Sequence, residues 1–161
     1  ATINGFAEAG LWKSGQIAVH TSGEFGIDVF RAATRQGVIP LAIHPAMRFT
    51  GTSIDLTRLR EAYFAVSAPK VALPIAEALV IEMGAEPIVI EEDQRQQYFE
   101  AFEVASSFSA LIVNQAIGLL EEINVADARG VLAPVIRSSV EQALAEGHHK
   151  LEPDDLLGGL D

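Results

Sequence analysis

Short apolar runs recur at regular intervals through the first half of the chain. They are Gln16–His20, Val38–His44, Tyr63–Ser67 and Pro87–Ile90. The segments between them carry apolar residues at helical spacing, as in Phe25–Ala33 and Pro69–Met83, and Gly84 marks a helix end after the second. Strands that alternate with helices in this way predict a parallel α/β sheet. Runs as apolar as Ile17–Val19 indicate strands that are buried on both faces.

The pattern changes after Glu91. From Gln94 to Asn124 only Gly118 interrupts the helical spacing, and apolar residues fall around almost the whole circumference of the predicted helix. A helix that is apolar all round must be enclosed by neighbours. One further predicted helix, Ala126–Glu146 with Pro134 kinking or dividing it, cannot surround it alone. We therefore expect a second copy of the chain to enclose it, in a homodimer that buries more than roughly 2,000 Å².

The first residues have the pattern of a helix end. Apolar residues of Ile3–Trp12 share one helical face, and the sequence opens with Ala1, so we expect the chain to come from a longer one. The acidic run Glu91–Asp93 is well placed to meet the positive end of a helix. No secretory leader is evident, and the 17-residue uncharged stretch Val104–Leu120 is short and polar for a bilayer span. These features predict a soluble, cytoplasmic protein with no membrane partner.

Composition and charge narrow the function further. Hydrophobic residues make up 49% of the 161 positions and charged residues 20%, which excludes a disordered chain. With 22 acidic and 11 basic side chains the net charge is −11, which argues against nucleic acid and anionic lipid as partners. The absence of cysteine excludes a disulfide scaffold and a cysteine nucleophile.

Two histidine segments stand at predicted strand ends. The first is His20–Gly23, where Ser22 and Gly23 could present N–H groups and a hydroxyl to an anion, or where Thr21 or Ser22 could simply cap a helix. The second runs from His44 to Gly51. Its imidazole, next to the rigid Pro45, could donate a proton or bind a carbonyl, or it could be an ordinary turn residue. Adjacent parallel strands would bring the two segments together.

Other candidates for chemistry are fewer. Tyr98 and Asn114 are the notable polar residues of the long predicted helix, and either could face a cleft or make a core hydrogen bond. His148 and His149, with the acidic residues that follow, suggest at most adventitious metal binding, so we predict no metal site. The chain also contains no GxGxxG or GxxxxGK loop, and we do not expect it to hold a dinucleotide tightly by itself.

The segments Val19–Gly23, Ala42–Met47 and Phe49–Gly51 together resemble the Rossmann-like oxidoreductases with a DUF2520 C-terminal domain. These are relatives of pyrroline-5-carboxylate reductase and 6-phosphogluconate dehydrogenase. The likeness continues through Gly84 and Tyr98 into the long helix. It implies the C-terminal part of a Rossmann-like parallel sheet (1–92), followed by a 6-phosphogluconate-dehydrogenase-like helical dimerisation domain (93–150) and a tail (151–161).

The resemblance also implies an activity: NADP-linked hydride transfer to a small carbonyl or imine, with NADP bound by the full-length protein. Thr21, Ser22 and Gly23 would then lie near the nicotinamide or substrate. His44 and Pro45 would line the same cleft. We accordingly predict His44 and Ser22 as catalytic residues, and as cleft residues His20, Thr21, Gly23, Pro45, Thr50 and Tyr98.

The sequence departs from that family at specific positions. Members commonly have Tyr-His where this chain has Tyr98-Phe99, and an asparagine where Ser106-Ser107 stands. The Thr-Gly-Pro and Arg-Gly-Asp segment expected after the last helix is also missing. The alternative function is therefore a non-catalytic module that binds a metabolite and dimerises. A small-molecule substrate or ligand is the partner that both hypotheses share.

Overall fold

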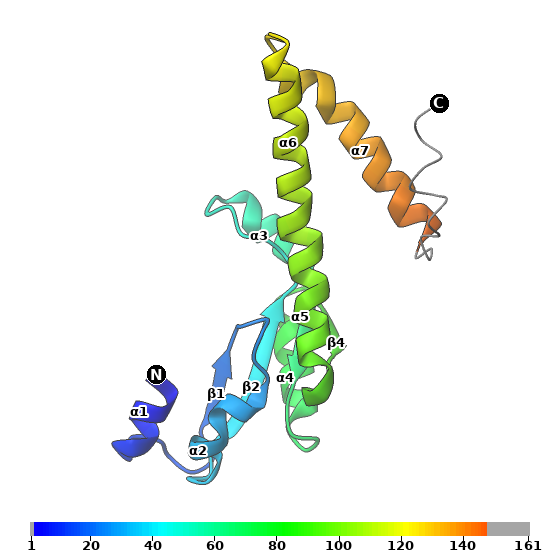
Figure 1. The fold of residues 1–161 in the computed structure, drawn as a ribbon. Helices are drawn as coiled ribbons and strands as arrows, with labels where there is room; N and C mark the ends of the chain where they lie inside the picture. The colour runs from blue at the N-terminus through cyan, green and yellow to red at the C-terminus, as the bar shows by residue number, and fades with distance from the viewer. Residues whose placement is uncertain (1, 148–161) are drawn as a thin grey trace. The chain divides into compact units, whose positions relative to one another are not determined.

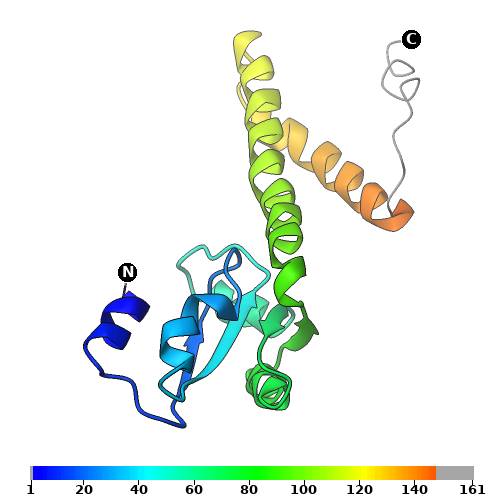
Figure 2. The same cartoon turned by 60° about the horizontal axis from the view of Figure 1, so that its bottom comes forward.

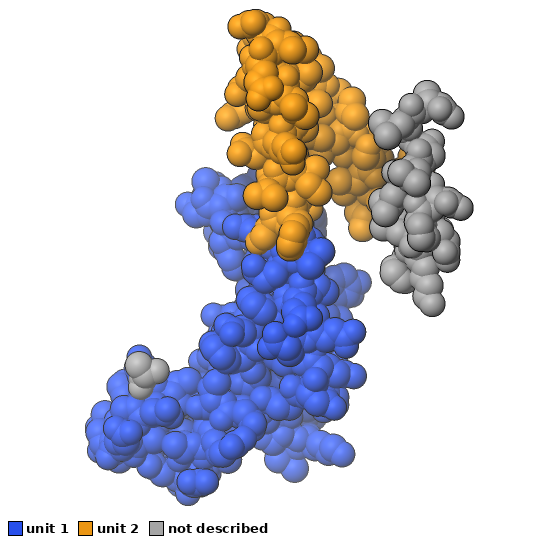
Figure 3. All heavy atoms as spheres, in the orientation of Figure 1, with its two compact units in different colours: residues 1–106 blue, residues 107–161 orange. Residues whose placement is uncertain are grey.

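The computed structural model describes residues 2–147 and divides the chain into two compact units. Unit 1 covers Ala1–Ser106 and unit 2 covers Ser107–Asp161, and Figure 3 colours them separately. His148 and His149 lie outside the described residues, as do the tail predicted for 151–161 and its acidic residues. The family resemblance implied a domain boundary at 92/93. The division into compact units does not test that boundary, which stays a prediction.

Unit 1 is built around a four-stranded sheet (Figures 1 and 2). Its strands are β1 (Ile17–His20), β2 (Ile39–Pro45), β3 (Tyr63–Ser67) and β4 (Glu86–Val89), and they lie side by side in sequence order. Each was predicted to within about one residue at either end. The α/β class with a helical C-terminal region is confirmed.

The sheet is mixed, which corrects the prediction of a wholly parallel one. β1 runs parallel to β2 and β3 parallel to β4, but β2 and β3 are antiparallel, with His44 opposite Ala65. A parallel connection needs a crossover that returns along the sheet face. The segment between β2 and β3 carries only the short helix α3 (Ile54–Leu59), which lies beyond the end of β2 in Figure 1. The chain therefore enters β3 from that same end.

Two apolar cores cover opposite faces of the sheet. On one face α4 (Leu73–Glu82) buries Ala76 and Val80 against a cluster from β2 and β3, namely Leu41, Ile43, Phe64 and Val66. On the other face the 3₁₀ helix η1 (Ile27–Phe30) and α2 (Arg31–Thr34) pack with α1 (Thr2–Glu8) on a second cluster, Ala18, Phe30, Ala33 and Val38. Because strand residues alternate between faces, His20 and His44 point to the side of the second cluster.

A long helical segment links the two units. It begins with η2 (Glu92–Gln94) and α5 (Arg95–Glu103), and it continues through a π-helical turn, η3 (Val104–Phe108), into α6 (Ser109–Glu122). This agrees with the helix predicted for Gln94–Asn124, except that the π-helical turn was not predicted.

Unit 2 pairs α6 with α7 (Ala128–Glu146). The side chain of Asp127 caps α7 by accepting a hydrogen bond from the backbone N–H of Gly130 at 3.0 Å. Pro134 lies inside α7 and does not divide it. By length and composition alone Glu92–Glu122 could cross a membrane, and none of its most apolar window is buried within the described chain. A single helix of this kind is weak evidence for a membrane span. The absence of a membrane partner stays a prediction.

Candidate functional site

The side chain of Arg95, in the first turn of α5, lies at the carboxyl end of β1. It is only 2% exposed. Its Nη2 donates to the carbonyl of Ser22 at 3.1 Å, just beyond β1. Its Nη1 donates to Ser67 Oγ at 3.2 Å and to the Ala65 carbonyl at 3.5 Å, both on β3. One guanidinium therefore ties the end of β1 to β3 beneath α5.

This buried cation has no carboxylate partner within the described residues. The one ion pair found there joins Arg31 to Asp28 on the surface. The Nε of Arg95 is fully enclosed and makes no hydrogen bond. Burial lowers the pKa of Arg95, whereas Tyr98 and Glu92 act in the opposite direction. A guanidinium keeps its proton in proteins, so the site holds a positive charge without a carboxylate in ion-pair contact.

His44 and Tyr98 meet directly beside this charge. The Nδ1 of His44 lies 2.7 Å from the phenolic oxygen of Tyr98. The edge-to-face partners of the imidazole are Tyr98 and Phe102, with ring centroids 5.7 and 5.1 Å away. The guanidinium of Arg95 also lies over the ring of Tyr98, with its Cζ atom 5.5 Å from the ring centroid. Positions 95, 98 and 102 share one face of α5. This one helix therefore supplies both aromatic residues that contact the imidazole of His44, and the arginine beside them.

The protonation states follow from these surroundings. Burial lowers the pKa of His44, and the charge of Arg95 lowers it further. Burial raises the pKa of Tyr98, and Arg95 partly offsets that rise. Near neutral pH the pair therefore consists of a neutral imidazole and an intact phenol.

Gly23 brings the first histidine segment against His44. A Cβ on Gly23 would stand 3.0 Å from both Cε1 and Nε2 of the imidazole, tighter than ordinary packing. The absence of a side chain at Gly23 therefore leaves room for the imidazole. The two segments do come together, as the parallel pairing of β1 with β2 requires.

His20 has a different environment. Its Nδ1 accepts from the backbone N–H of Ser22 at 3.2 Å, so its Nε2 carries the hydrogen and donates to the Gly26 carbonyl at 2.8 Å. The ring stacks on Phe30 at 5.5 Å. Burial lowers the pKa of His20 more than the Gly26 hydrogen bond raises it. Because both nitrogens are bonded within its own loop, His20 has no ring nitrogen left for a ligand.

Ser22 makes the capping-type contact expected of it, and its contact with an anion stays a prediction. Its Oγ accepts a long hydrogen bond from the backbone N–H of Phe25 at 3.4 Å, which is a turn-capping contact. Its carbonyl also receives Arg95, so the residue fixes the guanidinium beneath the His44 pair. Ser22 further lines a hollow of about 370 Å³ with His20 and Phe25.

Thr21 and Pro45 lie on the opposite face of the sheet. With Val19 and Phe49 they help line an almost entirely apolar groove of about 560 Å³. The structure therefore separates these two predicted cleft residues from the His44 pair. Both residues line the groove on the face of the sheet that α4 covers.

Thr50 makes its hydrogen bonds within its own loop. Its N–H and its Oγ1 both donate to Asp55 at 2.8 Å, and the N–H of Gly51 donates to the same carboxylate at 2.8 Å. Burial raises the pKa of Asp55, but these hydrogen bonds lower it more, so it stays below its ordinary value. No hydrogen bond joins Thr50 to His44 in the part of the chain that the structure describes.

The acidic run after β4 meets the positive end of a helix, as expected, although the helix is a distant one. Glu92 accepts from the backbone N–H groups of Ile27 at 2.8 Å and Asp28 at 3.2 Å, at the start of η1. Glu91 forms a capping box with Gln94 on its own segment. These contacts anchor the start of α5 to the first histidine segment.

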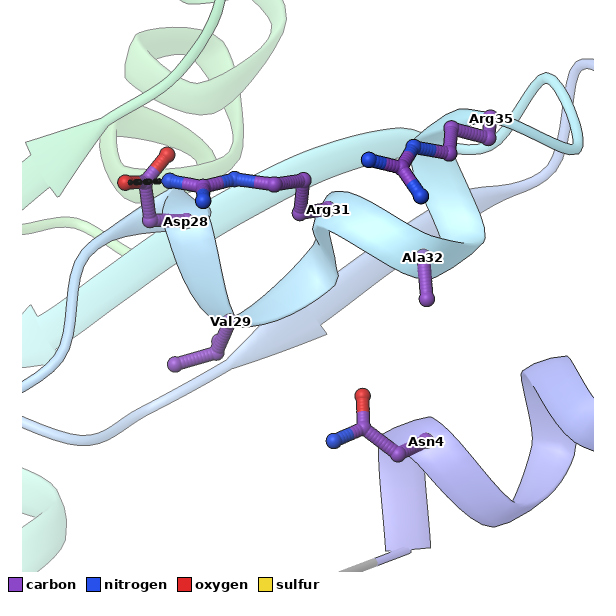
Figure 4. A pocket seen from close by; sticks show the side chains of 6 residues that line it. All are labelled: Asn4, Asp28, Val29, Arg31, Ala32 and Arg35. Atoms are coloured by element: carbon purple, nitrogen blue, oxygen red, sulfur yellow. Dashed lines mark hydrogen bonds and ion pairs between the residues drawn. The ribbon is translucent and has the colours of Figure 1, made fainter.

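A further hollow of about 470 Å³ lies between α1 and α2 (Figure 4). Arg31 points toward Asp28 and is paired with it, while Asn4 faces α2 from α1. This hollow is wide and exposed, and its one ion pair is complete. It lacks the buried, unpaired charge found at Arg95.

Sequence reasoning missed Arg95, Phe102 and Asp55. The spacing of Arg95, Tyr98 and Phe102 was the available signal, since it places an arginine and two aromatic residues on one helical face. Nothing in the local sequence of Asp55 distinguishes it from a solvated acid. The described residues contain no group of three or more potential metal ligands. The predicted absence of a metal site stays a prediction.

The residues around His44 supply uncharged proton donors and one buried cation, which suit the reacting end of a hydride-transfer site. The expectation that this chain does not hold a dinucleotide tightly by itself stays a prediction.

Comparison with known families identifies the fold. A Rossmann-like domain model matches residues 1–45, in agreement with the parallel β1–β2 unit. The model for DUF2520, a domain of unknown function, matches residues 62–152, which is more than half of the chain. The chain belongs to the DUF2520 family. No curated protein gives a significant match.

Solved structures show the same fold at low identity. A protein from Thermotoga maritima has a TM-score of 0.66 and 18% identity over 78% of this chain and 48% of its own. The pyrroline carboxylate reductase of Plasmodium falciparum, with NADP bound, has a TM-score of 0.63 and 10% identity over 99% of this chain and 62% of its own. The 1-pyrroline-5-carboxylate reductase of Streptococcus pyogenes has a TM-score of 0.58 and 14% identity over 98% of this chain and 59% of its own.

These relatives are considerably longer. The chain spans about half the length of the Thermotoga protein and less than two thirds of the two reductases. Its fold neighbours thus include reductases, one of them with NADP bound.

Proposed function

We propose that this chain is the substrate-side and dimerisation portion of an NADP-dependent oxidoreductase that reduces a small carbonyl or imine in the cytoplasm. The observation that carries the proposal is the 2.7 Å contact between His44 Nδ1 and Tyr98 beside the buried Arg95. Membership of the DUF2520 family and the fold shared with reductases support it.

In this proposal the reduced cofactor NADPH, held by the full-length protein, would supply the hydride. His44 is the residue that presents a proton to the substrate oxygen or nitrogen, through the Nε2 edge beside Gly23. Ser22 acts through its carbonyl, which fixes Arg95 under the pair. Phe102 and Tyr98 hold the imidazole in place and keep water from its upper face. Each of these roles uses a group that β1, β2 or α5 positions.

The test is a His44→Gln variant of the full-length protein. Gln keeps an N–H donor but cannot release a proton, so kcat for NADPH-dependent reduction should fall by a factor of about 10² to 10⁴. Gln97→Ala, on the exposed side of α5, is the matched control and should keep the parental kcat. Unchanged turnover in His44→Gln would refute the role of His44. Metabolite binding without any turnover in the parent would instead favour the non-catalytic module.

We also propose a homodimer formed through unit 2. α6 presents three stripes: a side toward α7 with Val113, Ile117 and Leu120, a polar strip with Asn114 and Glu121, and an exposed apolar stripe. The last contains Phe108, Leu111, Ile112 and Leu119, each 57–65% exposed in the single chain. An apolar stripe of this length on a soluble protein calls for a partner.

A charge on that stripe should separate the subunits. Leu111→Asp would bury an unpaired carboxylate in the interface, at a cost of several kcal/mol, and should give monomers by light scattering. Asn114→Asp places the same charge on the polar strip of the same helix and should leave the dimer intact. A parent protein that is a folded monomer at micromolar concentration would contradict the proposal.

A further inference from the structure

Three side chains form a connected series at the strand ends. Tyr98 is hydrogen-bonded to His44, and Arg95 lies against the ring of Tyr98. We propose that these residues form a proton relay, in which Tyr98 supplies the proton that His44 delivers to the substrate and Arg95 stabilises the phenolate left behind. The inference rests on the proposed reductase function and adds the source of its proton.

The direction of the relay follows from the acidity of the two partners. A phenol is a weak acid with an ordinary pKa near 10, and a neutral imidazole is the better base. The hydrogen bond between them is therefore strongest with the phenolic O–H donating to Nδ1. Nδ1 as acceptor places the imidazole hydrogen on Nε2. His20 has the same tautomer, fixed there by the N–H of Ser22.

The Nε2 of His44 makes no hydrogen bond to any described residue. It is also not a fully enclosed atom. Gly23, without a side chain, borders this edge of the ring. The relay thus has one end at the phenol of Tyr98 and the other at the Nε2–H of His44, which has no hydrogen-bond partner among the described residues.

The proton transfers balance as follows. As hydride reaches the substrate carbon from the nicotinamide, the Nε2–H bond breaks and an O–H or N–H bond forms on the substrate. The phenolic O–H bond of Tyr98 breaks and an Nδ1–H bond forms. His44 ends neutral in the other tautomer, and Tyr98 ends as a phenolate. Water returns the proton to Tyr98 after the product leaves.

The positive charge of Arg95 stabilises a phenolate on Tyr98. Its buried charge has no carboxylate in ion-pair contact among the described residues, so a phenolate on Tyr98 would have a cation beside it. The acid that acts on Arg95 from farther away, Glu92, accepts hydrogen bonds from the N–H groups of Ile27 and Asp28. Arg95 is the charged group that acts on both His44 and Tyr98, and it lowers the pKa of each.

Nuclear magnetic resonance of the full-length protein without cofactor tests the relay independently of turnover. The ¹⁵N shifts of His44 should show hydrogen on Nε2 and an acceptor at Nδ1, and Tyr98→Phe should give a mixture of tautomers. A hydrogen found on Nδ1 of His44 in the parent protein would overturn the relay. This reading holds whether or not the protein proves to be a reductase.

Removal of the cation provides the second readout. In Arg95→Met the pKa of the Tyr98 phenol, followed through its labelled ring carbon, should rise, and the pKa of His44 should rise as well. Arg95→Lys keeps the charge and should restore both. If Arg95→Met does not fold, Tyr98→Phe still decides. Its kcat should fall with a changed pH profile, and parental kcat and profile would show that Tyr98 supplies no proton.

Discussion

The two units of this chain satisfy their apolar and polar groups in different ways. Unit 1 encloses large side chains within itself, including Phe30, Leu41 and Val66, and it pairs its inner polar groups through Arg95 and Asp55. In unit 2 the described part of the chain has one buried residue, Ala128. Its large apolar side chains are exposed on both α6 and α7, with Leu144 at 78%.

The two units therefore differ in how much of their stability comes from apolar burial within a single chain. Burial of apolar surface is the main favourable contribution to folding, and unit 1 obtains it inside a single chain. The helices of unit 2 obtain little of it there. The site at His44 belongs to unit 1, so its geometry should depend on the sheet and α5.

The largest expected effect tests the core of unit 1. Phe64→Ala removes a side chain that is 3% exposed between the sheet and α4, and the free energy of unfolding should fall by about 3–5 kcal/mol. Leu144→Ala, on exposed α7, should change it by less than about 0.5 kcal/mol. Urea unfolding of both variants makes the comparison. Equal losses would show that the two units are not built differently.

A smaller effect tests the close approach at Gly23. In Gly23→Ala the new Cβ meets the imidazole of His44 at 3.0 Å, so the ring must move and its contact with Tyr98 should lengthen. We expect a loss of about 1–3 kcal/mol in unfolding free energy and a shifted His44 resonance. Gly5→Ala, in α1 with open space around it, is the control and should not destabilise. An unshifted His44 resonance in Gly23→Ala would mean that the segments are farther apart.

The strands were predictable because their signals are local. Each apolar run, such as Tyr63–Ser67, is bounded by turn residues, and its burial follows from the run itself. The direction of β3 was not predictable, because it depends on whether the intervening segment recrosses the sheet. That choice is made by tertiary packing around α3, and the sequence of Ile54–Leu59 does not state it.

The candidate site was predictable in part for the same reason. His44 and the His20–Gly23 segment follow predicted strands, and parallel neighbours share an edge. Arg95 is distant in sequence and joins the site only when α5 lies over the strand ends. The assignment of Pro45 and Thr21 to the same cleft was limited by the pleat, since residues next to one another on a strand face opposite ways.

The smallest effect at neutral pH concerns the loop held by Asp55. Its pKa is lowered in the folded protein by hydrogen bonds from Thr50 and Gly51, so its contribution to stability is complete above the ordinary carboxyl pKa and is lost as pH falls through the lowered one. Asp55→Asn should remove this part of the acid dependence, measured as unfolding free energy against pH. Because the Thr50 loop makes no hydrogen bond to His44 among the described residues, the His44 resonance should stay unchanged. A shift there would show that the loop and the relay residues are coupled after all.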